Sequence, residues 1–287
     1  MNVWSALCVL FGLLFLRVDL LGTETTPHVL VSVAPYKFLV EKIAKDTITV
    51  DLMVPAGASA HTFEPTPKQM IKAGSADIWF LLGESFETKA SQALLAHKPS
   101  LRLVDLRQNV DLITADPISG ACCCCAGSQD LHIWLSCIQA RIQSETIANA
   151  LIAAFPQHKE LYEKGLQSLK KDLQQLNDNI QEILKPVVNR VMMVSHPAYA
   201  YFCRDFHFKQ LSIEIEGKDP TPKQLHTVLN LARALSVKKI FAQPQYSTKG
   251  AQLFAKELGA ELIILDPYSE EYMQTMLTIA KRLAQDS

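Results

Sequence analysis

HKELYEKGLQSLKKDLQQLNDNIQEILK, residues 158–185, is the most regular segment of the chain. Its apolar residues recur at alternating spacings of three and four and so form one stripe on a helix, namely Leu166, Leu169, Leu173, Leu176, Ile180 and Ile183. At ~1.5 Å per residue this helix would be roughly 40 Å long, and Pro186 would end it. A coiled-coil dimer is one interpretation of the stripe. Because there are fewer than four heptads inside a larger chain, a helix lying along the body of its own protein is favoured.

Apolar, strand-like runs alternate with helical segments on both sides of this helix. Four such runs precede it, at 28–34, 48–54, 77–83 and 101–106, and four follow it, at 190–196, 209–215, 238–243 and 261–266. Strands separated by helices form parallel βαβ units. We therefore expect an α/β fold of two lobes, each a mainly parallel sheet flanked by helices. One long helix would join the lobes, and ligands would bind in the cleft between them, at the carboxyl ends of the strands.

The same patterns predict the domain boundaries. Residues 3–16 form an uncharged apolar run that is shorter than the ~20 residues of a membrane span, so residues 1–24 are expected to be a signal peptide. No positive charge precedes the run, and an uncleaved N-terminal anchor is the alternative. Residues 25–156 would form the N-terminal lobe, residues 157–186 the linking helix, and residues 187–287 the C-terminal lobe.

Composition limits the classes of function. The chain has 287 residues, of which 48% are hydrophobic and 20% charged, as in an ordinary globular protein. The formal net charge of −1 gives no reason to expect nucleic acid as a partner. A cleaved leader predicts a soluble periplasmic protein, and a long helix packed on its own chain is consistent with a monomer.

Seven cysteines are present, and four of them, Cys122 to Cys125, are consecutive in a predicted surface loop at 107–131. Neighbouring cysteines rarely pair with each other because the geometry is strained. The run could pair with Cys137 or with other chains in an oxidising compartment, could collect soft metal ions, or could be a variable loop of little function. Cys203 is expected to be a small buried apolar residue.

Three histidines stand where a ligand would be expected. His61 lies in the loop after the second strand, His132 lies at the start of a helix, and His196 and Asp266 lie at strand ends. No pair has the short spacing of a zinc finger or of H-E-x-x-H, so the tertiary structure would assemble the site. Three imidazoles and one carboxylate would complete a four-coordinate shell for a divalent transition metal. A closed shell favours a metal carrier over an enzyme; a zinc hydrolase and a surface adhesin are the alternatives.

Specific motifs surround these candidate ligands. His61 opens HTFEPTPKQ, His132 lies in DLHIWL, and His196 opens HPAYAYF. The C-terminal half contains EGKDPTPKQL (216–225), IFAQPQYS (240–247) and LDP (265–267). Together these motifs, which cover nearly all of the chain after the leader, resemble the extracytoplasmic zinc- and manganese-binding proteins of ABC metal importers, the ZnuA/TroA-like periplasmic solute-binding proteins.

The resemblance implies that His61, His132, His196 and Asp266 bind the ion. It implies zinc as the transported ligand, with manganese or iron as alternatives, and an ABC permease and ATPase at the inner membrane as partners. Three departures stand out: Gln243 replaces a frequent glutamate, Leu131 replaces a usual proline, and cysteines fill a loop that is often rich in histidine.

Two further expectations concern how the imidazoles would behave. Hydrogen-bonded groups usually orient metal-binding rings, and Glu64, Ser195 and Glu216 are candidates for this role. Because only neutral imidazoles bind metal, affinity should fall as the pH drops through about 6.5.

Overall fold

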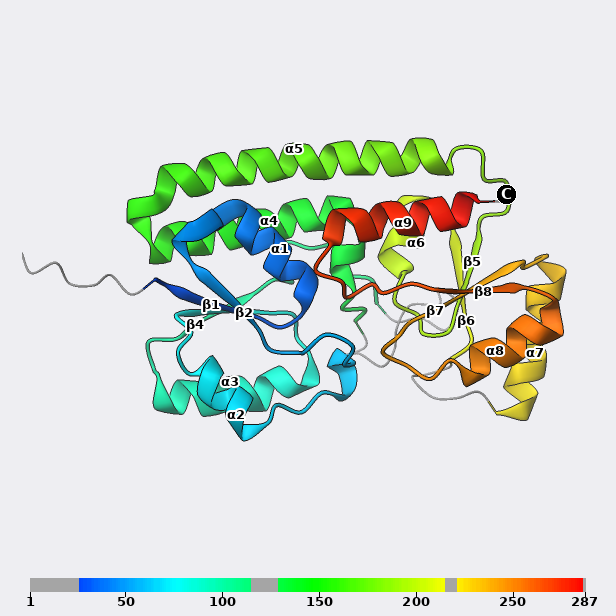
Figure 1. Ribbon diagram of the computed structural model, residues 1–287, viewed down its shortest axis with the longest axis horizontal. Helices are drawn as coiled ribbons and strands as arrows, with labels where there is room; N and C mark the ends of the chain where they lie inside the picture. Colours follow the sequence, from blue (N-terminus) through cyan, green and yellow to red (C-terminus); the bar gives the residue numbers. More distant parts are fainter. Residues whose placement is uncertain (1–25, 115–128, 215–220, 286–287) are drawn as a thin grey trace, which may run out of the picture.

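Two parallel sheets of four strands form the framework of the protein in a computed structural model, which describes residues 26–114, 129–214 and 221–285 (Figure 1). The first sheet has the order β2-β1-β3-β4 and the second the order β6-β5-β7-β8. The strands of the first sheet are β1 (His28–Val31), β2 (Thr49–Leu52), β3 (Ile78–Leu81) and β4 (Arg102–Asp105). Those of the second are β5 (Val191–Val194), β6 (Lys209–Ser212), β7 (Lys239–Ala242) and β8 (Glu261–Ile264). Each strand lies inside a run predicted from the sequence, so the two-lobed α/β fold is confirmed.

Helices follow the strands as the sequence predicts. In the first half they are α1 (Ala34–Ala44), α2 (Pro67–Ala73), α3 (Ser85–His97) and α4 (Cys137–Ala154), and in the second half α6 (Ala200–Asp205), α7 (Pro222–Ala234), α8 (Lys249–Leu258) and α9 (Tyr272–Ala284). The short 3-10 turns are η1 (Lys45–Thr47), η2 (Ala60–Thr62), η4 (Ile133–Leu135) and η5 (Pro156–His158).

The sequence placed His132 at the start of a helix, but α4 begins five residues later, at Cys137. The side chain of Ser136 accepts a hydrogen bond from the backbone N–H of Gln139 and so begins α4 at the next residue, Cys137. The preceding turn, η4, is thereby separated from the helix and carries His132 at its beginning.

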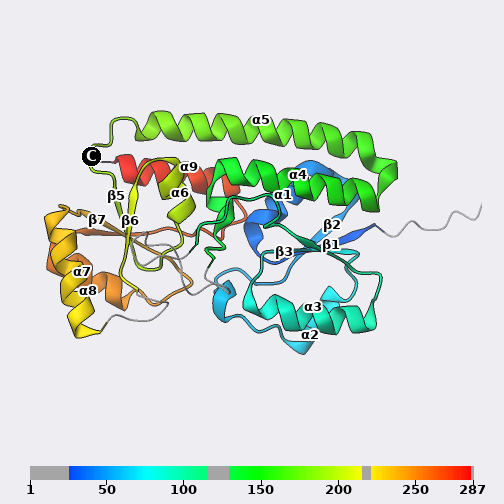
Figure 2. The same ribbon diagram turned by 180° about the vertical axis from the view of Figure 1, so that it is seen from behind.

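Helix α5 (Lys159–Leu184) is a single helix of 26 residues, about 39 Å long at 1.5 Å per residue. Its buried side is the predicted stripe, with Leu169, Leu173, Leu176 and Ile180 almost completely buried. Figures 1 and 2 show α5 running along one side of the whole molecule, above α4, α1 and α9. The stripe therefore packs on its own chain, and no coiled-coil partner is needed to bury it.

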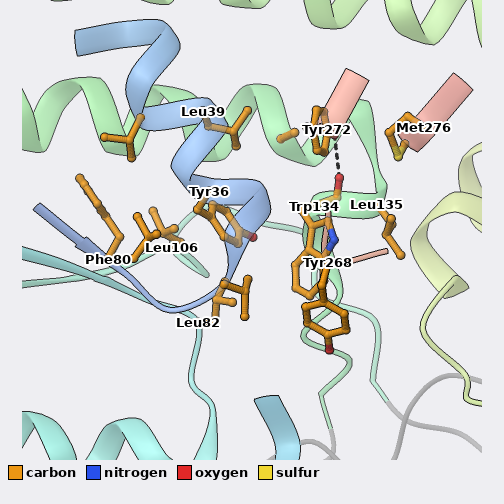
Figure 3. Close-up of a cluster of buried hydrophobic side chains, with 14 of the residues drawn as sticks. Tyr36, Leu39, Phe80, Leu82, Leu106, Trp134, Leu135, Tyr268, Tyr272 and Met276 are labelled. Atoms are coloured by element: carbon orange, nitrogen blue, oxygen red, sulfur yellow. Dashed lines mark hydrogen bonds between the residues drawn. The ribbon is translucent and has the colours of Figure 1, made fainter. Parts of the chain in front are cut away.

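One hydrophobic core spans the two lobes, and a second, smaller cluster lies within the C-terminal lobe. Helix α9 follows the last strand of the second sheet but packs beside α5, and its first residue, Tyr272, stacks on Phe38 of α1 with ring centroids 5.6 Å apart. The Tyr272 hydroxyl donates to the carbonyl oxygen of Trp134 at 2.7 Å (Figure 3). The indole N–H of Trp134 donates to the carbonyl oxygen of Pro267 at 2.8 Å. These contacts fix the segment after β8 to the first lobe.

Some sequence predictions concern residues that the structure does not describe. The predicted signal peptide, Cys122 to Cys125 and Glu216 lie outside the described residues. Cys137 and Cys203 are buried free thiols, as predicted for Cys203. Among the residues described, no helix has both the length and the apolar character needed to cross a membrane.

Candidate metal centre

Three histidines far apart in the sequence meet between the two sheets. His61 lies in η2 after β2, His132 immediately precedes η4, and His196 lies two residues beyond β5. One ring nitrogen from each lies within 4.8 Å of the other two, and no other group of three or more histidine, cysteine or acidic residues in the described chain meets this condition. The Nε2 atoms of His61 and His132 are 3.3 Å apart. The structure therefore brings the three predicted histidines together at the junction of the lobes.

A carboxylate contacts the Nδ1 atom of each ring. Glu84 Oε2 lies 3.1 Å from Nδ1 of His61, Asp130 Oδ1 lies 2.8 Å from Nδ1 of His132, and Glu214 Oε2 lies 2.7 Å from Nδ1 of His196. A carboxylate only accepts hydrogen bonds, so each Nδ1 carries the proton and each Nε2 presents a lone pair. This is the arrangement in which imidazoles bind metals through Nε2.

These carboxylates are not the groups expected from the sequence. Glu64 is exposed, and the buried Ser195 hydroxyl makes no hydrogen bond, so neither orients a ring. The actual partners did leave a signal in the sequence. Asp130 stands two residues before His132, and Glu84 and Glu214 stand just beyond the carboxyl ends of β3 and β6.

Burial makes the site an unfavourable place for positive charge. The side chains of His61, His132 and His196 are 5%, 0% and 1% exposed. Burial, reinforced by the nearby charges of His132 and His61, holds the pKa of His196 well below its usual value. Burial also acts to lower the pKa of His61, but the hydrogen bond to Glu84 and the charges of Glu84, Asp130 and Glu214 outweigh it and leave that pKa raised. A proton would therefore compete with a metal ion more strongly at His61 than at His196.

Asp266 lies outside the group of three histidines. It stands two residues beyond β8, and its Oδ1 accepts hydrogen bonds from Nε2 of Gln245 at 2.6 Å and from the backbone N–H of Tyr268 at 3.0 Å. The carboxylate is half-buried. In this arrangement Asp266 is held by its own lobe and not by an imidazole.

Two tyrosine hydroxyls, not anticipated from the sequence, reach the Nε2 atoms. The Tyr268 hydroxyl lies 3.1 Å from Nε2 of His132. The Tyr246 hydroxyl lies 3.3 Å from Nε2 of His196, and its ring stacks on that imidazole with centroids 4.2 Å apart. Tyr246 belongs to the phrase IFAQPQYS, and Tyr268 directly follows the phrase LDP.

Comparison with known proteins agrees with this geometry. The family model described as "Zinc-uptake complex component A periplasmic", ZnuA, matches residues 29–286. The chain belongs to the ZnuA family. A Chlamydia muridarum protein, named provisionally as metal-binding, is 34% identical over 275 residues, 96% of each chain. The Streptococcus pneumoniae protein PsaA, named as a manganese ABC transporter substrate-binding lipoprotein, is 25% identical over 249 residues, 83% of this chain and 77% of PsaA.

Comparison with solved structures agrees with this assignment. A solved structure of ZnuA is 30% identical and superposes with a TM-score of 0.84, covering 91% of this chain and 98% of that one. The ZnuA family comprises extracytoplasmic metal-binding solute-binding proteins of ABC importers and not enzymes. The predictions of a two-lobed solute-binding protein and of a metal carrier in place of an enzyme are therefore confirmed.

Proposed function

We propose that this protein binds one divalent transition metal ion, zinc by preference, through Nε2 of His61, His132 and His196. The observation that carries the proposal is the pairing of every Nδ1 with a carboxylate, which leaves three Nε2 lone pairs facing one space. The separation of 3.3 Å between Nε2 of His61 and His132 supports zinc. In a tetrahedron with Zn–N bonds of about 2.0–2.1 Å, neighbouring nitrogens are about 3.3 Å apart.

Asp266 would supply the fourth donor. It stands two residues beyond β8, as His196 stands two residues beyond β5, and the carboxyl ends of parallel strands lie at one edge of a sheet. A carboxylate oxygen beside three imidazoles suits zinc and is also compatible with manganese or iron. The availability of each metal would decide which ion occupies the site. The ion would then bridge the lobes formed by residues 25–156 and 187–287.

The protein would act outside the inner membrane and deliver its ion to an ABC permease with its ATPase. Residues 1–24 would be the signal peptide that takes it to the periplasm. Since α5 buries its apolar stripe on its own chain, the protein would work as a monomer.

The test is metal analysis of the purified protein, with zinc and manganese competing. We expect about one zinc per chain and loss of tight binding in His61→Ala, His132→Ala and His196→Ala. Asp266→Ala should bind more weakly than the wild-type protein. The exposed His97 gives a matched control, His97→Ala, which should bind like the wild-type protein. Unchanged affinity in all three variants of the central histidines would reject the assignment.

A further inference from the structure

The hydroxyls of Tyr246 and Tyr268 lie within hydrogen-bond distance of two of the Nε2 atoms proposed to bind the ion. Tyr246 stands four residues beyond β7 and Tyr268 four residues beyond β8, and Ala242 pairs with Ile264 at the ends of these strands. The two tyrosines are therefore at equivalent positions on neighbouring strands. Their hydroxyls lie 3.3 Å from Nε2 of His196 and 3.1 Å from Nε2 of His132.

The direction of these hydrogen bonds follows from the carboxylates. Glu214 and Asp130 take the Nδ1 protons of His196 and His132, so both Nε2 atoms accept. Each tyrosine hydroxyl is then the donor. An ion that binds His132 or His196 needs the same lone pair, so the hydroxyl and the ion exclude each other.

Both tyrosines also contact residues of the first lobe. The Tyr268 ring is buried, packs against Trp134 with centroids 5.1 Å apart, and its backbone N–H binds Asp266. The Tyr246 hydroxyl accepts a hydrogen bond at 3.1 Å from Ser59, two residues before His61. Each tyrosine comes from the second lobe, while Trp134 and Ser59 belong to the first. The hydroxyls thus sit at the lobe junction.

We propose that Tyr246 and Tyr268 are displaceable caps on the metal-binding nitrogens. Their hydroxyls bind Nε2 of His196 and His132 when the ion is elsewhere, give way when the ion enters, and return when it leaves. This inference rests on the proposed function. The caps lower the affinity below what the three imidazoles alone would give, and they promote release because the nitrogens regain a hydrogen-bond donor as the ion departs.

The test compares Tyr246→Phe and Tyr268→Phe with the wild-type protein. Phenylalanine keeps the ring and removes the competing donor. A net neutral hydrogen bond contributes about 0.5–1.5 kcal/mol, so each variant should bind zinc roughly 2- to 12-fold more tightly. Affinity is measured by competition with a chromophoric chelator, and zinc release by stopped-flow mixing with excess EDTA. We expect the gain in affinity to come mainly from slower release.

Tyr162→Phe is the matched control, because the Tyr162 hydroxyl contacts Thr47 next to α5 and not an imidazole. It should leave zinc affinity and release unchanged. A second readout is the near-ultraviolet tyrosine spectrum. Zinc should change it in the wild-type protein, and less so in each Phe variant.

The outcomes separate the two proposals. If the wild-type protein does not bind zinc, manganese or iron tightly, the proposed function fails. If it binds tightly and both Phe variants have the same zinc affinity and release rate as the wild-type protein, the cap proposal is wrong. If the Phe variants bind more weakly, the phenol oxygens are ligands and the cap proposal is overturned.

Discussion

Nδ1 of His196 lies 2.7 Å from Oε2 of Glu214 because parallel pairing puts the two residues side by side. Val194 of β5 pairs with Ser212 of β6 at the ends of the two strands. His196 and Glu214 each stand two residues further along the chain. The backbone pairing continues past the strands, with the N–H of Glu214 donating to the carbonyl oxygen of Ser195 at 3.0 Å. The backbone of the sheet therefore sets the orientation of the His196 ring.

Removing this carboxylate should weaken metal binding without removing a ligand. Loss of a group that orients a metal-binding histidine costs about 10- to 100-fold in affinity, which is the expectation for Glu214→Ala. Glu214→Gln should lose less, because its amide oxygen still accepts a hydrogen bond. Zinc competition titrations measure the effect. Glu261→Ala, at an exposed glutamate on β8, is the control, and equal affinity in all three variants would contradict this role of Glu214.

Metal binding should weaken as the pH falls, beginning above the usual pKa of histidine. A protonated ring cannot bind the ion, and the pKa of His61 is raised by Glu84 and the other carboxylates. A higher pKa means that protonation starts at a higher pH, so affinity declines on acidification by about tenfold per pH unit for each proton displaced. Zinc affinity measured from pH 8.5 to pH 5 checks this. Glu84→Gln should move the onset to lower pH, and a flat profile would exclude proton competition.

Gly165→Ala should destabilise the fold. An added Cβ at this position of α5 would collide with the carbonyl oxygen of Ile43 and lie 2.9 Å from its Cα. Both are backbone atoms of α1, so relief requires the helices to separate, at a cost of about 1–3 kcal/mol. Urea unfolding measures the change. Ser168→Ala, at an exposed position of the same helix, should leave the midpoint unchanged or raise it, and similar midpoints for the two variants would argue against close packing.

The lobes should unfold together, and Tyr272→Phe should lower the stability of both. The Tyr272 hydroxyl donates to the buried Trp134 carbonyl, and losing the donor to a buried acceptor costs about 1–3 kcal/mol. Far-ultraviolet circular dichroism and tryptophan fluorescence should give one coincident transition in both proteins. Two separated transitions would show that the lobes are not coupled through this contact.

The framework of the fold was predictable because it depends on local periodicity. The stripe on α5 repeats over 26 residues, and each strand is a short apolar run between turn or helix signals. The three histidines were found because each lies in a distinctive phrase. The end of a strand such as β5 also marks a place where ligands gather in parallel sheets.

The partners of the histidines were harder to predict because they depend on register and side-chain reach. Glu64 is closer than Glu84 to His61 in the sequence, yet Glu64 is exposed and Glu84 accepts the hydrogen bond. Glu214 can be recognised as the partner of His196 only when the register between β5 and β6 is known. The positions of the tyrosine hydroxyls depend on the paths of the loops after β7 and β8. No apolar pattern in the sequence predicts those paths.

The placement of α9 beside α1 and α5 bears on how the protein matures. Lys37 pairs with Glu270 at 2.8 Å, and the indole N–H of Trp134 donates to the carbonyl oxygen of Pro267, so the first lobe is tied to a segment that follows β8. An incompletely folded chain would hold His61 and His132 without His196 fixed beside them. A metal ion would then meet only two of the three imidazoles and would bind weakly. Tight capture would therefore require the completely folded protein.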